Sequence, residues 1–187
     1  MAGIYNYSNY DYFGHLCEVP QDVLNNLMDY YQGVKDLKSD LYSDVYDQWY
    51  AQDSPIDEKH VEISWIHWRD KEKLLPTLQF FQQYVGNICK FRFSRLDKDS
   101  EIPYHAKHSL PRIHIPLNDS GSVFIVKDIN GNEHKYELSY GHAHFINVTM
   151  LHKVINTVPI IRLNSFFCFT HFTNEKLKER FIKYPKI

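Results

Sequence analysis

The sequence predicts an α+β domain that is mainly β, with a jelly-roll core and N-terminal helices packed on one of its sheets. Helical periodicity is concentrated before residue 90, and from there onward short alternating segments are separated by turn residues. Helices followed by many short antiparallel strands are typical of this architecture. The 187 residues suit a single domain with a sizeable core.

Two helices and one strand are expected in a helical support region that spans residues 1–90. Each helix has an apolar stripe at helical spacing and a proline near its start, where a missing N–H is tolerated. The helices are expected at 20–33 and 71–85, and the strand at 61–68. The polar, tyrosine-rich 34–59 stretch is either a surface excursion, which is the simpler interpretation, or a lid over a site.

The jelly-roll core is expected to occupy residues 91–172. The dipeptide Asn130-Gly131 between two of its strands is typical of a type I′ hairpin turn. Residues 173–187 are expected to form a C-terminal helix capped by Thr173 or Asn174. The expected strands are 90–96, 112–117, 122–129, 133–138, 141–147 and 160–170.

Composition excludes several classes of protein. The formal net charge of -2 argues against a dedicated nucleic-acid binder. The N-terminus lacks the pattern of a signal peptide, and no apolar run is long enough to span a bilayer. The three cysteines are far apart and form no CxxC pair, so neither a disulfide framework nor a structural zinc site is expected. We therefore expect a cytoplasmic protein that binds neither membrane nor nucleic acid.

Two predicted strands each carry a basic side chain among apolar neighbours. Arg112 and His114 share one face of their strand, and Arg162 shares a face with Asn164 and Phe166. A buried arginine is costly without an anion, and a dicarboxylate would supply one through a bidentate pair. The alternative is that both arginines pair with protein carboxylates at a sheet edge.

Five short matches, taken in order, give the chain a resemblance to a known family. They are Ile102-Pro103-Tyr104-His105, the Arg112–Leu117 strand, Gly141 eleven residues before His152, the run His152-Lys153-Val154-Ile155-Asn156, and Arg162 ten residues after His152. With this order and spacing, the stretch from Phe93 to Phe169 resembles the aspartyl/asparaginyl β-hydroxylase-like branch of the Fe(II)/2-oxoglutarate-dependent oxygenases.

The resemblance implies a double-stranded β-helix, which is a cupin-like jelly roll, and an iron site. It implies that His105 and His152 bind Fe(II), and that Arg162 holds the distal carboxylate of 2-oxoglutarate with help from Arg112 or His114. With O2 as the second co-substrate, the implied reaction is hydroxylation of an amino acid, a peptidyl Asp or Asn, or another small substrate. The sequence leaves the substrate and the oligomeric state open.

One position departs from the usual pattern of these oxygenases. Most bind iron through two histidines and a carboxylate two residues after the first histidine, and here that position is Lys107. Some members of the branch lack the carboxylate, and His108 is a further candidate ligand. Two alternatives stay open: a degenerate cupin that binds a metal or small anion without turnover, and a metal-dependent cupin isomerase or dioxygenase that needs no 2-oxoglutarate.

Overall fold

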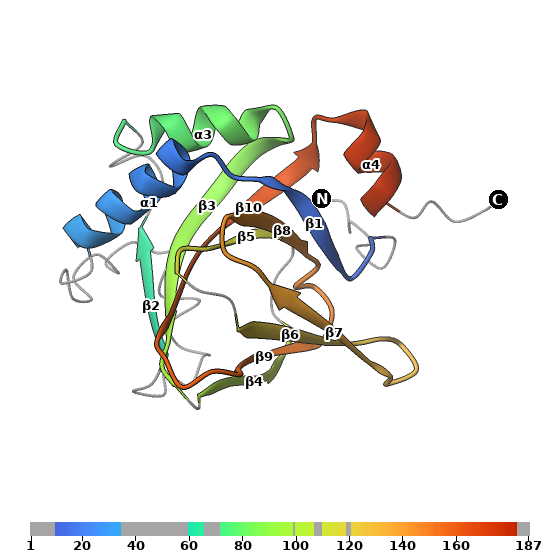
Figure 1. Cartoon of the computed structure of the whole chain (residues 1–187). Helices are drawn as coiled ribbons and strands as arrows, with labels where there is room; N and C mark the ends of the chain where they lie inside the picture. Colours follow the sequence, from blue (N-terminus) through green and yellow to red (C-terminus); the bar gives the residue numbers. More distant parts are fainter. Residues whose placement is uncertain are drawn as a thin grey trace.

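The computed structural model is a sandwich of two antiparallel β-sheets with helices on the outer face of the larger sheet (Figure 1). The larger sheet has the strand order β1-β8-β5-β10-β3-β2, and the smaller has the order β4-β9-β6-β7. The structure describes residues 10–34, 60–65, 72–98, 100–106, 110–118 and 121–182, with only the backbone described for 60–65, 89 and 90.

From β3 onward the chain crosses repeatedly between the two sheets. The bounds of the helices and strands are β1 Phe13–Glu18, α1 Gln21–Val34, β2 His60–Trp65, α3 Leu75–Gln82, β3 Val85–Leu96, β4 Glu101–His105, β5 Arg112–Pro116, β6 Ser122–Lys127, β7 Glu133–Leu138, β8 His142–Ile146, β9 His152–Asn156, β10 Arg162–Phe172 and α4 Glu175–Phe181.

The predicted fold class is confirmed, and three strands were not foreseen. These are β1, β4 and β9. The region 1–90, expected to be a helical support, also contributes β1, β2 and the start of β3 to the larger sheet. A short edge strand such as β1 has no clear alternation of its own, because its order comes from pairing with β8. Almost all of the 34–59 stretch lies outside the described residues.

One face of the larger sheet packs against the three helices in a continuous apolar layer. Phe81 of α3 meets Phe167 of β10 with ring centroids 4.8 Å apart. Phe181 of α4 meets Phe145 of β8 at 4.7 Å. Helix α4 begins after Asn174, whose side chain accepts hydrogen bonds from two backbone N–H groups, as the sequence predicted. Because this layer is apolar, the polar side chains of the same strands lie on the opposite face, between the sheets.

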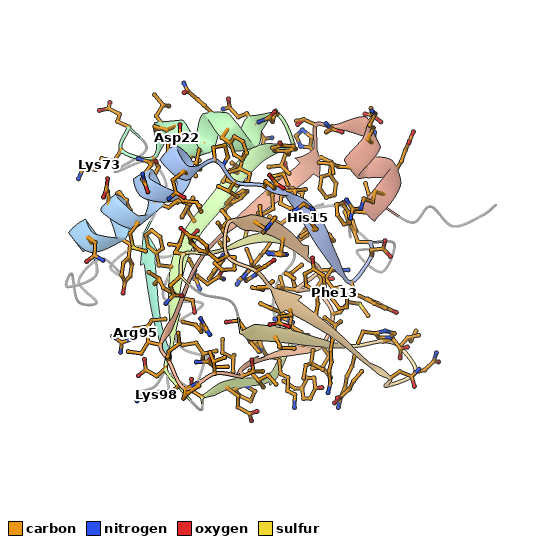
Figure 2. All side chains as sticks on the ribbon, viewed as in Figure 1. Phe13, His15, Asp22, Lys73, Arg95 and Lys98 are labelled. Atoms are coloured by element: carbon orange, nitrogen blue, oxygen red, sulfur yellow. The ribbon has the colours of Figure 1, made fainter. Side chains whose placement is uncertain are left out.

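The interior of the sandwich is closed on the side where β1 approaches β7. Phe13 of β1 stacks on Tyr136 of β7 with ring centroids 4.6 Å apart, and His15 lies on the same strand (Figure 2). The Tyr136 hydroxyl is 3.0 Å from Nδ1 of His144, and the Ser139 backbone N–H donates to Nε2 of His144. His144 is therefore a buried histidine held by protein groups.

The β6–β7 connection differs from the predicted type I′ turn. The loop covers 128–132, and Gly131 has a φ of +85° while Asn130 is not among the residues with positive φ. A type I′ turn requires positive φ at both central positions. The carboxylate of Asp128 explains the difference, because it accepts hydrogen bonds from the backbone N–H groups of Asn130 and Asn132, both at 2.8 Å.

We expect stability to fall in acid partly through His144, which is 2% exposed. Burial lowers the pKa of His144 to about 4, whereas a histidine in the unfolded chain titrates near 6.5. The contribution of His144 to the free energy of unfolding is complete above pH 6.5. It is lost as the pH falls toward 4, by up to about 1.4 kcal/mol per pH unit, because the unfolded state binds the extra proton.

His144→Gln should therefore show a shallower loss of unfolding free energy between pH 6.5 and 4 than the wild type. Urea denaturation at a series of pH values measures the two slopes. The comparison isolates His144, since other buried histidines contribute equally to both proteins. Equal slopes would contradict the assignment.

Candidate metal and anion site

His105 and His152 lie opposite each other on the neighbouring strands β4 and β9. Their ring centroids are 4.2 Å apart. Strand pairing joins Ile102 to Val154 and then His105 to His152, so β4 has one residue more than β9 over this interval. This β-bulge turns His105 to the same face as Ile102, whereas plain alternation would point it away. Pro103 lies within the bulge, on an edge strand, where a missing N–H is tolerated.

The tautomer of each histidine is fixed by a hydrogen bond to the backbone carbonyl two residues earlier in the chain. Nδ1 of His105 is 2.8 Å from the carbonyl oxygen of Pro103, and Nδ1 of His152 is 2.8 Å from that of Met150. A carbonyl only accepts, so each Nδ1 carries the proton and Nε2 carries the lone pair. Histidines that bind metals in proteins are oriented by this kind of bond.

The two histidines fit a divalent transition metal. His152 is 2% exposed, and burial lowers its pKa to about 3, so it keeps its lone pair at neutral pH. Neutral imidazole nitrogens are suitable ligands for Fe(II), and two of them leave coordination positions open for other ligands. Within the described residues, no three His, Cys, Asp or Glu side chains are placed to hold a metal ion. Lys107 and His108 lie outside those residues.

His114 of β5 lies beside this pair, in the interior of the sandwich. It is 4% exposed, stacks on Phe166 at 5.1 Å, and meets the edge of Phe124 at 4.7 Å. Phe124 in turn stacks on His152 at 6.1 Å. Burial, followed by the charge of Arg112, lowers the pKa of His114 well below its usual range. His114 is therefore a neutral polar group in an aromatic environment.

Arg112 is the arginine whose charge affects the pKa values of these histidines. It is 6% exposed, and its guanidinium carbon lies 4.5 Å from the centroid of the Phe166 ring. The charge of Arg112 lowers the pKa of His114, and it also lowers that of His152 after burial and the charge of His105. The guanidinium of Arg112 therefore adds a positive charge to this part of the interior.

Arg162 occupies a different part of the interior, at the start of β10. It is 3% exposed. The side chain of Asn118 bonds to the backbone on both sides of Arg162: it donates to the Ile161 carbonyl at 2.8 Å and accepts from the Leu163 N–H at 2.9 Å. The guanidinium lies against Gly121, where a Cβ would come within 2.7 Å of Nη2. Asn118 therefore holds the backbone on both sides of Arg162, and Gly121 leaves room for its guanidinium.

The two arginines lie at different levels of the same sheet face. Arg112 pairs with Cys168 on β10, and Arg162 lies six residues earlier on that strand. At roughly 3.3 Å per residue, their backbones are about 20 Å apart along the strand. Arg92 of β3, which is also buried, pairs with Phe166 and lies between these two levels. Arg112 and Arg162 are thus two separate cationic positions.

Several residues that position the site were missed from the sequence. Arg92 lies between Phe91 and Phe93, and this is the same pattern of an arginine among apolar neighbours that marked Arg162. No sequence signal marks Asn118 or Gly121, because their roles depend on which backbone atoms they approach.

Three further histidines have protein partners. His15 and His142 are joined by a hydrogen bond of 3.0 Å between Nε2 and Nδ1. His134 is 3.2 Å from the carboxylate of Asp128, and its ring is tilted against that of Tyr12 with centroids 4.8 Å apart. A His-x-His metal pair of His142 and His144 is not supported, since the nitrogens of His144 are engaged by Tyr136 and Ser139.

Two solved structures have the same fold as this chain. An oxidoreductase of the 2OG-Fe(II) oxygenase family from Burkholderia pseudomallei aligns with a TM-score of 0.50 and 14% identity, over 77% of this chain and 89% of that one. A prolyl-4-hydroxylase from Pseudomonas putida aligns with a TM-score of 0.53 and 11% identity, over 90% and 96% of the two chains. At these identities the likeness shows the fold, which is the jelly roll.

Comparison by sequence gives no match, either to a family model or to a curated protein. In the described part of the chain, no helix is long and apolar enough to cross a membrane.

Gly121→Ala should disturb the position of Arg162, and Gly131→Ala provides a matched control. Gly121 has a φ of +122°, and a Cβ there would crowd Nη2 of Arg162 and Val158. Gly131 also has a positive φ, of +85°, but a Cβ there would meet nothing within 4 Å. Both substitutions carry a backbone cost of about 1–3 kcal/mol, and the first adds a steric clash.

We expect Gly121→Ala to lose more unfolding free energy than Gly131→Ala in chemical denaturation. Of the two, only Gly121→Ala should also weaken the binding of a dicarboxylate, measured by calorimetry. Equal effects of both substitutions on binding would mean that Gly121 does not set the position of Arg162.

Proposed function

We propose that the protein is an Fe(II)- and 2-oxoglutarate-dependent oxygenase that hydroxylates a small substrate. One observation carries the proposal. His105 and His152 lie opposite each other with both Nδ1 protons donated to carbonyl groups, in a jelly roll whose interior also holds buried arginines. The fold shared with a 2OG-Fe(II) oxygenase and with a prolyl-4-hydroxylase supports it.

In this proposal His105 and His152 hold the metal through Nε2. The bound Fe(II) supplies the redox chemistry that activates O2 at the expense of 2-oxoglutarate. Overall, 2-oxoglutarate, O2 and a substrate C–H group become succinate, CO2 and an alcohol. Phe124 packs against both His152 and His114, and Phe166 packs against His114, so these rings exclude water there and strengthen the electrostatic interactions.

The dianionic 2-oxoglutarate requires positive charge and hydrogen-bond donors. Arg162 pairs with the carboxylate distal to the metal, as the family resemblance implies. The charge of Arg112 lowers the pKa of His152, and the charge of His152 lowers the pKa of His114. In this proposal His114 and Arg112 therefore act on the part of the ligand nearer the metal. The different levels of the two arginines along β10 support this division of roles.

The substrate class is an amino acid, a peptidyl Asp or Asn, or another small molecule. This range follows from the resemblance to the aspartyl/asparaginyl β-hydroxylase-like branch. The finer assignment rests on the motifs around His105, His152 and Arg162.

A degenerate cupin that binds a metal or small anion without turnover is the second candidate. Lys107, in place of the usual carboxylate, favours it, as does the lack of a third His, Cys, Asp or Glu ligand among the described residues. Succinate release in the presence of Fe(II), 2-oxoglutarate and O2 separates the two functions. A mass-spectrometric screen of amino acids and peptides for an added oxygen then identifies the substrate.

Anaerobic addition of Fe(II) and 2-oxoglutarate should produce the weak visible charge-transfer band of the chelate and should raise the melting temperature. His105→Ala and His152→Ala should abolish the band, because each removes one of two protein ligands. His134→Ala, on the exposed β7 hairpin, is the control and should retain it. A band that survives in His152→Ala would place the metal elsewhere, and a wild type with neither band nor stabilisation would contradict the proposal.

Arg162→Ala should weaken 2-oxoglutarate binding by about 2–5 kcal/mol, the cost of losing one partner of a buried charge pair. Arg162→Lys should recover part of the loss, because the charge returns without the planar fork. Arg112→Ala is the matched comparison, with circular dichroism to confirm that each variant is folded. If Arg162→Ala binds normally while Arg112→Ala does not, Arg112 is the principal anchor.

A further inference from the structure

His114 and Asn164 form a polar pair within the aromatic interior. Nδ2 of Asn164 lies 2.7 Å from Nδ1 of His114. The amide nitrogen only donates, so Nδ1 accepts and the single proton of the neutral ring must be on Nε2. Among the described residues, this Nε2 is buried and has no hydrogen-bond partner.

A buried donor without a partner costs about 1–3 kcal/mol. Such a group in an otherwise packed interior calls for a partner from outside the protein, which is either an ordered water or a ligand. His114 is linked to His152 through the ring of Phe124, whose centroid lies 4.7 Å from that of His114 and 6.1 Å from that of His152. Oδ1 of Asn164 also has no partner among the described residues, so the bond to His114 is the one hydrogen bond that the structure gives this amide.

We propose that Asn164 is a positioning residue that holds His114 in its Nε2–H tautomer, so that His114 donates a hydrogen bond to a carboxylate oxygen of the bound co-substrate. This inference rests on the proposed function for the identity of the ligand, and it assigns to Asn164 a role that the motifs do not include. In this proposal Asn164 acts through His114.

The tautomer matters because the neutral ring has only one proton. If an acceptor stood in place of the Asn164 amide nitrogen, the proton would move to Nδ1, and Nε2 would turn a lone pair toward the carboxylate. The imidazolium form, which donates from both nitrogens, is disfavoured in the wild type by burial and by the charges of Arg112, His152 and His144. Asn164 therefore allows a neutral histidine to serve as the donor.

The first test is nuclear magnetic resonance of the protein labelled with ¹⁵N-histidine, recorded without metal or ligand. The ring nitrogens of His114 are assigned from the signals that disappear in His114→Gln. We expect Nε2 to be protonated and Nδ1 to be unprotonated at neutral pH. Protonation of Nδ1 would overturn the proposal, because Asn164 would then accept from the ring.

The second test is the affinity for 2-oxoglutarate of the Fe(II)-loaded protein, measured anaerobically between pH 6 and 8.5. In Asn164→Asp, the introduced carboxylate draws the remaining proton to Nδ1 when the ring is neutral. We expect binding at high pH to be about tenfold weaker than in the wild type, which is the loss of one hydrogen bond to a charged group. The deficit should narrow as the pH falls, because the introduced negative charge favours the doubly protonated ring, which donates from both nitrogens.

Asn25→Asp, on the exposed face of α1, adds the same charge outside the site and is the control for the ratio to wild type. A deficit in Asn164→Asp that is independent of pH would indicate a merely structural role and would overturn the inference. If Asn164→Asp does not fold, Asn164→Ala in the same resonance experiment should show a mixture of tautomers for His114, and an unchanged Nε2–H form would overturn it. A wild type that binds no 2-oxoglutarate contradicts the proposed function, whereas the tautomer measurement does not depend on that result.

Discussion

The β-bulge in β4 is the constraint on which the arrangement of the site depends. It shifts the strand by one residue between Ile102 and His105, so that His105 faces His152. Without the bulge, Tyr104 would occupy the position opposite His152. In the structure Tyr104 instead lies on the outer face, with the Lys127 ammonium 4.1 Å from its ring centroid. A single extra residue thus determines whether one candidate metal ligand or two lie on this face of the smaller sheet.

The larger sheet separates an apolar layer from a polar one within the same strands. On β10, Phe167 packs under the helices, while Arg162 and Phe166 face the smaller sheet. The helical layer supplies most of the hydrophobic burial, so the opposite face can hold buried charges and histidines that a small core would not tolerate. The resulting interior combines cationic groups with aromatic walls.

Strand alternation was sufficient to predict which face Arg112, His114 and Arg162 share, because that argument requires only a period of two. It would have failed for His105, whose direction depends on a bulge; the resemblance to a family placed this residue among the candidates. The turn at Asn130 was mispredicted because the Asp128 carboxylate bonds to the backbone of the loop. Contacts that join distant segments, or that a side chain makes with backbone, leave no periodic pattern in the sequence.

The polar groups of the site are oriented mainly by hydrogen bonds to uncharged partners. Backbone carbonyls orient His105 and His152, and an amide side chain orients His114. The side chain of Asn118 holds the backbone around Arg162. Each of these neutral partners fixes the direction of a group without placing a further charge in the interior, where an uncompensated charge would be costly.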